Sequence, residues 1–168
     1  DQARDEGFTP LYIACQKGHL EVAKLLLEGS AAVNQAEEDG ATPLCMACEK
    51  GHVDIVRLLL EAGAAMDQAK EDGGTPLSLV CYNGHLEVAK LLSSYGASRA
   101  ATPFGTPEEV ATEEGHADLA AWLVASRGWT PLAHLETLTA ARALSLLRSG
   151  ASLHEGEPTP LQLSLIHI

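Results

Sequence analysis

The amino-acid sequence repeats itself with a period of 33 residues over its first hundred positions, and this period constrains the fold more than any other feature. The tripeptide Thr-Pro-Leu starts at Thr9, Thr42 and Thr75. The dipeptide Gly-His starts at Gly18, Gly51 and Gly84. Two separate markers keep one period, so chance is a poor explanation. A period of about 20 to 50 residues is typical of stacked supersecondary units, each of which buries its apolar face only against its neighbours.

The first half of each unit predicts a short helix, as the unit from Gly40 to Asp72 shows. The hydroxyl of Thr42 can accept a hydrogen bond from a backbone N–H two or three residues on, which makes it a natural N-cap. Pro43 then stands at the first helical position, where its fixed φ is already helical and no N–H is needed. Apolar residues follow on one helical face at Leu44, Ala47 and Cys48.

The second half of the unit predicts another helix, from about residue 53 to residue 61. Asp54 lies in its first turn, where the helix dipole favours an acid. One side of the helix is apolar, with Val53, Val56, Leu59 and Leu60. Gly63 is suited to the left-handed position that ends such a helix, and the polar stretch after it predicts an extended connection to the next Thr-Pro.

The G-x-T-P-L start, the Gly-His pair, the L-L-L-E-x-G-A ending and the 33-residue period together resemble the ankyrin repeat. The resemblance implies an all-α solenoid of stacked antiparallel helix pairs, with each connection projecting as a β-hairpin-like finger. It also implies a concave groove lined by the finger tips and the exposed ends of the first helices, where such repeats vary from unit to unit.

On this basis we divide the chain as a single ankyrin-repeat domain over 1–168. Residues 1–7 align with 67–73, so we read them as the finger of a preceding repeat in a longer array. The units that follow are 8–40, 41–73, 74–104, a fingerless repeat 105–128, a degenerate repeat 129–157 and a truncated repeat 158–168.

Several positions depart from the repeat pattern. Ser30 stands where other units have glycine, which predicts that the first unit closes its second helix differently. Glu108 replaces the inward-pointing leucine, which predicts a more exposed helix start. Trp122, Arg127 and Trp129 lie in the shortened junction before the fifth unit. That unit has no Gly-His, and Thr139 could cap its second helix directly.

Composition and charge narrow the function classes. The 168 residues are 46% hydrophobic, enough for a continuous aliphatic core, and carry a formal net charge of -12. This charge opposes binding to nucleic acid and to an anionic membrane surface. No apolar run approaches the roughly 18 to 20 residues that would span a bilayer. We therefore expect a cytoplasmic monomer without membrane insertion.

The sequence offers no constellation for catalysis, so we expect no enzyme activity, cofactor or metal. Cys15, Cys48 and Cys81 recur at the repeat period, which favours core packing; Cys45 and Cys48 leave a zinc or redox pair as the lesser alternative. His19, His52, His85 and His116 follow a glycine at one repeated place, which indicates a structural role, satisfying backbone groups of the turn. No Walker A, Rossmann or G-x-S-x-G motif is present.

What remains is surface, and it favours a non-catalytic protein-interaction scaffold. The expected binding residues on the groove and finger tips are Asp5, Glu6, Phe8, Tyr12, Gln16, Lys17, Glu38, Asp39, Glu49, Lys50, Glu71, Asp72, Tyr82 and Asn83. Acidic pairs at successive tips would form a negative ladder that steers a basic or mixed-charge protein segment, although charged tips also serve simply to keep loops solvated. Exposed Phe8, Tyr12 and Tyr82 would be its anchors. The alternative is a structural or regulatory arm of a larger protein.

Overall fold

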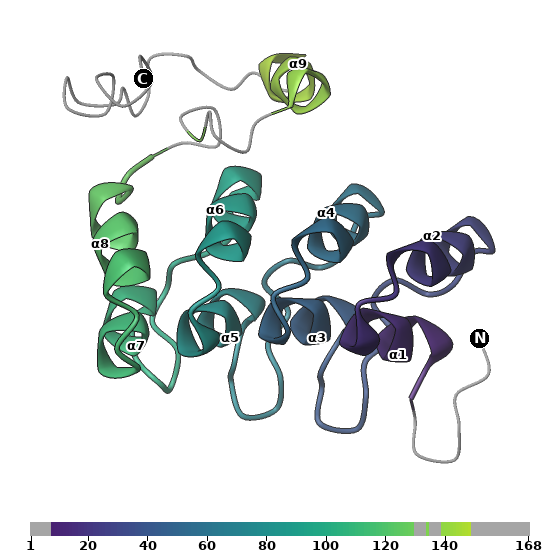
Figure 1. The fold of residues 1–168 in the computed structure, drawn as a ribbon, viewed down its shortest axis with the longest axis horizontal. Coiled ribbons are helices and arrows are strands. Elements are labelled where there is room, and N and C mark those ends of the chain that lie inside the picture. Colours follow the sequence, from purple (N-terminus) through teal and green to yellow (C-terminus); the bar gives the residue numbers. More distant parts are fainter. Residues whose placement is uncertain (1–7, 130–133, 135–138, 149–168) are drawn as a thin grey trace.

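The structure is a computed structural model that describes residues 8–129, 134 and 139–148 and is all-α over these residues. Figure 1 shows the helices as a stack of antiparallel pairs, with α1, α3, α5 and α7 in one row and α2, α4, α6 and α8 in another. The helices are α1 (Pro10–Lys17), α2 (Leu20–Glu28), α3 (Pro43–Glu49), α4 (Val53–Glu61), α5 (Pro76–Asn83), α6 (Leu86–Tyr95), α7 (Pro107–Glu113), α8 (Ala117–Ala125) and α9 (Ala140–Arg148). The expected finger over 1–7, the parts 130–133, 135–138 and 149–157 of the fifth unit, and the truncated unit 158–168 lie outside the described residues.

The four helices of the first row begin as predicted, at a proline that follows a capping threonine. The hydroxyl of Thr9 accepts from the Tyr12 N–H at 3.1 Å, and Thr42, Thr75 and Thr106 accept in the same way. In two units the side chain three residues after the threonine also accepts a hydrogen bond from the backbone N–H of that threonine. Ser78 Oγ accepts from the Thr75 N–H, and Glu109 Oε2 accepts from the Thr106 N–H, both at 2.8 Å. In these two units the capping box fixes where the first helix begins.

The second helices end in a left-handed residue. Gly63 has a φ of +85°, as predicted, and the Ala64 N–H bonds to the Leu59 carbonyl at 2.9 Å. The prediction that Ser30 makes the first unit close differently is wrong. Ser30 itself takes the left-handed conformation, with a φ of +65°, and the Ala31 N–H makes the equivalent bond to Leu26 at 2.9 Å. The bonding pattern outweighs the strain of a non-glycine residue there, which costs about 1–2 kcal/mol.

The core lies between the two rows and runs through the stack without interruption. Cys15, Cys48 and Cys81 belong to it and are 0% exposed, which confirms the packing role inferred from their period. Cys45 is buried in a smaller cluster with Tyr12, Ala41 and Met46. Burial raises the pKa of Cys15 and of Cys81 to about 12, so these thiols stay protonated and unreactive at neutral pH.

Histidines of the Gly-His pairs connect neighbouring units. His85 Nε2 lies 2.9 Å from the Glu49 carbonyl oxygen, and His116 Nε2 lies 3.0 Å from that of Tyr82. A carbonyl oxygen only accepts, so Nε2 carries the hydrogen in both rings. The prediction that the Gly-His histidines satisfy backbone groups is confirmed for His85 and His116, but the carbonyl belongs to the preceding unit. The His85 ring rests on Gly51, where a Cβ would lie 2.6 Å from Nδ1.

The connections project from the stack as two fingers, finger 1 (31–41) and finger 2 (64–74) (Figure 1). Each ends in a hairpin-like turn, closed by the Glu37 N–H on the Ala41 carbonyl and by the Lys70 N–H on the Gly74 carbonyl, both at 2.9 Å. The Glu71 N–H bonds across to the Asp39 carbonyl at 2.9 Å, which joins the two tips. The expected hairpin-like fingers are therefore present and linked.

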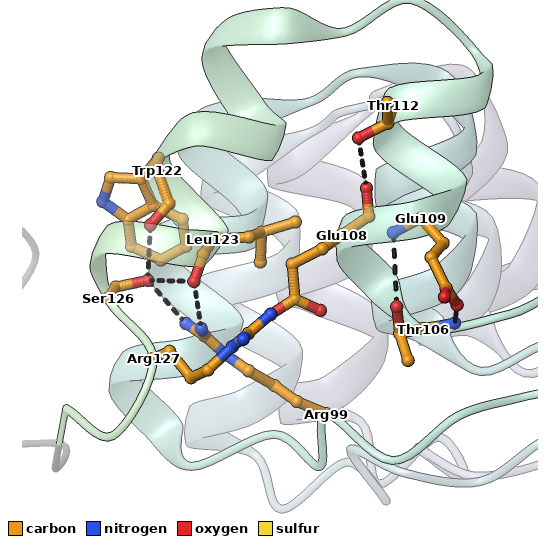
Figure 2. A network of polar contacts seen from close by, with 9 residues as sticks. All are labelled: Arg99, Thr106, Glu108, Glu109, Thr112, Trp122, Leu123, Ser126 and Arg127. Atoms are coloured by element: carbon orange, nitrogen blue, oxygen red, sulfur yellow. Dashed lines mark hydrogen bonds and ion pairs between the residues drawn. The ribbon is translucent and has the colours of Figure 1, made fainter.

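A polar network holds the fourth unit to the third (Figure 2). The Arg99 guanidinium donates to the Leu123 carbonyl and to Ser126 Oγ, both at 2.9 Å, and to Ser93 Oγ at 3.1 Å. Cations are favoured at helix C-termini such as the end of α8. The network explains how the fourth unit, although it is not joined to the third by a full finger, still packs on the third.

Glu108 only partly matches its prediction. It is half-buried, whereas the leucines at the same register, Leu11, Leu44 and Leu77, are at most 1% exposed; its cap Thr106, however, is half-buried as Thr75 is. The Glu108 side chain itself is only 13% exposed, because it turns toward the Arg127 guanidinium at 3.2 Å (Figure 2). An ion pair thus replaces the apolar contact that leucine would make.

The shortened junction predicted around the two tryptophans is an aromatic cluster. The rings of Trp122 and Trp129 lie 6.4 Å apart, and the ring of His134 lies 5.7 Å and 5.2 Å from them. Arg99 lies over the Trp122 ring at 5.4 Å, a favourable cation–π distance. Beyond it α9 begins directly after Thr139, where the sequence predicted a helix start.

Candidate partner-binding surface

The first-row helices and the finger tips form one face of the stack, which we call the finger face. Each first-row helix places an apolar side chain on it four residues after the capping threonine. These side chains are Ile13, Met46, Leu79 and Val110. Met46 and Val110 are buried and the other two are half-buried, so a continuous apolar row crosses the face.

A groove of about 310 Å³ opens on the finger face between α5 and α7. It is lined by Asp72, Ser78, Leu79, Tyr82, Phe104 and Val110. Tyr82 is 57% exposed and Phe104 is 52% exposed, so two aromatic side chains present large apolar surfaces beside one hollow. Exposed aromatic side chains beside a pocket are the usual anchors of protein interfaces.

Phe104 is held by the turn 102–105, which replaces the finger of this unit. The Thr102 N–H bonds to the Gly105 carbonyl at 2.9 Å, and the Phe104 N–H bonds to Thr102 Oγ1 at 3.2 Å. Pro103 packs on Gly73 so closely that a Cβ there would lie 2.6 Å from Pro103 Cγ. Sequence reasoning missed Phe104, although an aromatic residue in a Thr-Pro-Phe-Gly turn is a recognisable signal of an exposed ring.

Tyr82 is exposed as expected, but the expected exposure of Tyr12 is wrong. Tyr12 is only 5% exposed, because it packs with Ala41 and Cys45 beneath finger 1. The half-buried ring of Phe8 lies 5.4 Å from it. Burial, with smaller contributions from nearby acids such as Glu37, raises the pKa of Tyr12 to about 12. Tyr12 therefore supports the finger face from below and offers a partner little surface.

The acidic ladder is exposed at its described tips but is not uniformly available. Asp5 and Glu6 lie outside the described residues, whereas Glu38, Asp39, Glu71 and Asp72 are exposed.

Two of these tip carboxylates serve their own turns. Asp39 Oδ1 accepts from the Ala41 N–H at 3.0 Å, and Asp72 Oδ1 accepts from the Gly74 N–H at 2.8 Å. The ammonium of Lys70 then lies 3.1 Å from Asp39 Oδ2 and 3.7 Å from Asp72 Oδ2. The Ala41 N–H, followed by Lys70, holds the pKa of Asp39 below its usual value. The acidic ladder predicted from the sequence did not include Lys70, which lies between two of its carboxylates.

The remaining expected residues lie along the finger face with varied exposure. Gln16 and Asn83 are half-buried, and the Asn83 amide donates to the Leu79 carbonyl at 2.8 Å. Lys17 is exposed. Lys50 forms an ion pair with the neighbouring Glu49 at 2.8 Å, which partly neutralises both charges.

Among the described residues, no group of three or more His, Cys, Asp or Glu side chains is placed to hold a metal ion. Within the same part of the chain, none of the helices has the length and apolar character needed to cross a membrane.

Stacked helix pairs, linked fingers and a variable finger face define a helical-repeat protein. The family model for ankyrin repeats, in three copies, matches residues 1–70 and 62–135, and the chain belongs to the ankyrin repeat family. A search of curated proteins finds no match to this chain. Ankyrin repeats are generally protein–protein interaction modules and are typically non-enzymatic.

Proposed function

We propose that this chain is a non-catalytic scaffold that binds a partner polypeptide on its finger face. The observation that carries the proposal is the groove of about 310 Å³ between Tyr82 and Phe104. Both rings are more than half exposed, and each extends from a hydrogen-bonded stretch of backbone, α5 for Tyr82 and the turn 102–105 for Phe104. Backbone that is already ordered loses little entropy on binding, which favours affinity.

The rest of the proposed contact surface follows the finger face on either side of this groove. We add Phe104 and Leu79 to the binding residues expected from the sequence, because both line the groove. We remove Tyr12, because it is buried beneath finger 1. The proposed surface then comprises Asp5, Glu6, Phe8, Gln16, Lys17, Glu38, Asp39, Glu49, Lys50, Glu71, Asp72, Leu79, Tyr82, Asn83 and Phe104. We place this function in the cytoplasm, since the four buried cysteines are free thiols, which suits a reducing compartment.

The proposal is tested by selecting a displayed library of random 12-residue peptides against the purified chain. The selected peptides are then measured against Tyr82→Ser and Phe104→Ser, with Leu25→Ser as the matched control, because Leu25 is 66% exposed on α2 in the other row. We expect each groove variant to weaken binding by about tenfold or more and the control to leave it unchanged. Binding that survives both groove variants contradicts the proposal.

A structural or regulatory arm of a larger protein is the second candidate, and one observation favours it. Val22 on α2 is 48% exposed, whereas the residues at the same register, Ile55 on α4 and Val88 on α6, are at most 2% exposed. The outer face of α2 is thus built like a buried stacking face. If the arm is the function, fusing one further repeat before residue 8 raises the melting temperature, and the peptide selection yields no binder.

A further inference from the structure

We infer that the groove selects a partner segment that combines a bulky apolar side chain with a lysine or arginine close to it in sequence. This inference rests on the proposed function and adds the chemistry of the partner. The apolar side chain would enter between Tyr82 and Phe104 and contact Leu79 at the floor, and the cation would lie over the adjoining rim.

The segments that form the groove carry acids, and the cation of Lys70 lies at the side of the groove toward finger 1. The groove is formed by the tip of finger 2 (71–74), the turn 102–105, α5 and α7, and every charged side chain on these four segments is an acid. These acids are Glu71, Asp72, Glu108, Glu109 and Glu113. Glu108 turns away to pair with Arg127, and the others are exposed. The charge of this rim therefore complements a cation and repels an acidic segment.

Two of these acids are placed to meet a cation beside the groove. Asp72 lines it directly, and its side chain is 52% exposed. Its Oδ1 serves the Gly74 N–H, but Oδ2 lies 3.7 Å from the Lys70 ammonium, which sits closer to Asp39 at 3.1 Å. Glu113 occupies the register of Tyr82, one helix further along the same face. A guanidinium can thus approach Asp72 without displacing the tighter Lys70–Asp39 pair.

The basic residues of the finger face lie on the other side of the groove, which gives the site a direction. Lys17 and Lys50 extend from the ends of α1 and α3, and Lys70 stands between the two finger tips. The partner's cation is therefore favoured toward α7 and disfavoured toward α3. The formal net charge of -12 also disfavours a second copy of this chain as the occupant.

The test uses the 12-residue peptides selected above and a charge-neutral double variant, Glu71→Gln with Asp72→Asn. The asparagine keeps an oxygen for the Gly74 N–H, so the finger turn is preserved. The control is Asp54→Asn with Glu61→Gln, two exposed acids on α4 in the other row. Affinity and association rate are measured at 50 and 300 mM salt by surface plasmon resonance.

We expect selected peptides to be enriched in lysine or arginine within about four residues of a bulky apolar residue, the spacing of one helical turn. The Glu71/Asp72 double variant weakens their binding about threefold to tenfold, as two exposed charge contacts imply, and the control does not. Raising the salt concentration slows association to wild type more than to the double variant.

The outcomes separate this inference from the proposed function. Peptides that need Tyr82 and Phe104 but show no basic enrichment, or that bind the charge-neutral variant equally well, sustain the proposed function and overturn the inference. A library that yields no binder overturns both. Self-association of the chain that Phe104→Ser abolishes, seen by analytical ultracentrifugation, makes a second copy the occupant and also overturns the inference.

Discussion

Replacing Gly51 by alanine tests the link between units directly. Gly51 has a φ of +73°, and a Cβ there would lie 2.6 Å from Nδ1, 2.7 Å from Cε1 and 2.9 Å from Cγ of His85. The His85 ring cannot tilt away freely, because its Nε2 is bonded to the Glu49 carbonyl at 2.9 Å. Alanine at this position therefore meets two separate penalties, one from the backbone and one from the neighbouring unit.

Gly115 provides the matched control, since it occupies the same place in the fourth unit. Its φ is +80°, but no described atom lies within 4 Å of a Cβ placed there. The fifth unit has no Gly-His pair, so no histidine follows in register. Gly115→Ala should cost only the left-handed backbone penalty of about 1–2 kcal/mol. Gly51→Ala should cost the same and, in addition, about 1–3 kcal/mol for overpacking against His85.

The measurement is urea unfolding followed by circular dichroism, with the free energies of the two variants compared with that of the parent chain. The double variant Gly51→Ala with His85→Ala should recover the overpacking part, less about 1 kcal/mol for the lost hydrogen bond. If Gly51→Ala and Gly115→Ala destabilise the chain equally, the His85 ring does not restrict this glycine and the reasoning fails.

Three further predictions concern the joints and the end of the stack. Ser30→Gly should stabilise the chain by about 0.5–1 kcal/mol in urea unfolding, because glycine removes the left-handed strain at a smaller entropy cost; destabilisation would contradict this. Arg99→Ala should destabilise it by about 2–4 kcal/mol in the same assay, since three charge-assisted bonds and the Trp122 contact are lost. Burial, followed by the charge of Arg99, lowers the pKa of His134 to about 4 from 6.5. The unfolded chain then binds the extra proton first, so stability should fall as pH drops from about 6.5 toward 4, and His134→Asn should flatten that slope.

The sequence predicted well those features that neighbouring residues determine. The helix starts follow from a threonine and a proline side by side, and α4 begins and ends at the residues expected from its apolar spacing. The period then identified the stack, because each unit has to bury the same face as the unit before it. Cys15 was placed in the core by that argument alone.

The candidate surface was less predictable, because side-chain exposure there depends on residues distant in sequence. Tyr12 is covered by Ala41, which finger 1 brings over it. Phe104 is exposed because Pro103 packs on Gly73, 30 residues earlier. Lys70 reaches an aspartate of the preceding finger. Each of these contacts joins two units, and one-unit reasoning on spacing and composition has no information about them.

The link between His85 and Gly51 bears on how such an array can lengthen over time. The second and third units each supply a glycine that receives the histidine ring of the next unit and a histidine that lies on the glycine of the unit before. A gene duplication of one whole 33-residue period adds both groups together, and the new copy fits between its neighbours without any second mutation. The link also tolerates a slightly shorter spacing, since Gly115 follows Gly84 by 31 residues and His116 still reaches the Tyr82 carbonyl at 3.0 Å. A duplicated segment of about one period therefore keeps the fit between units.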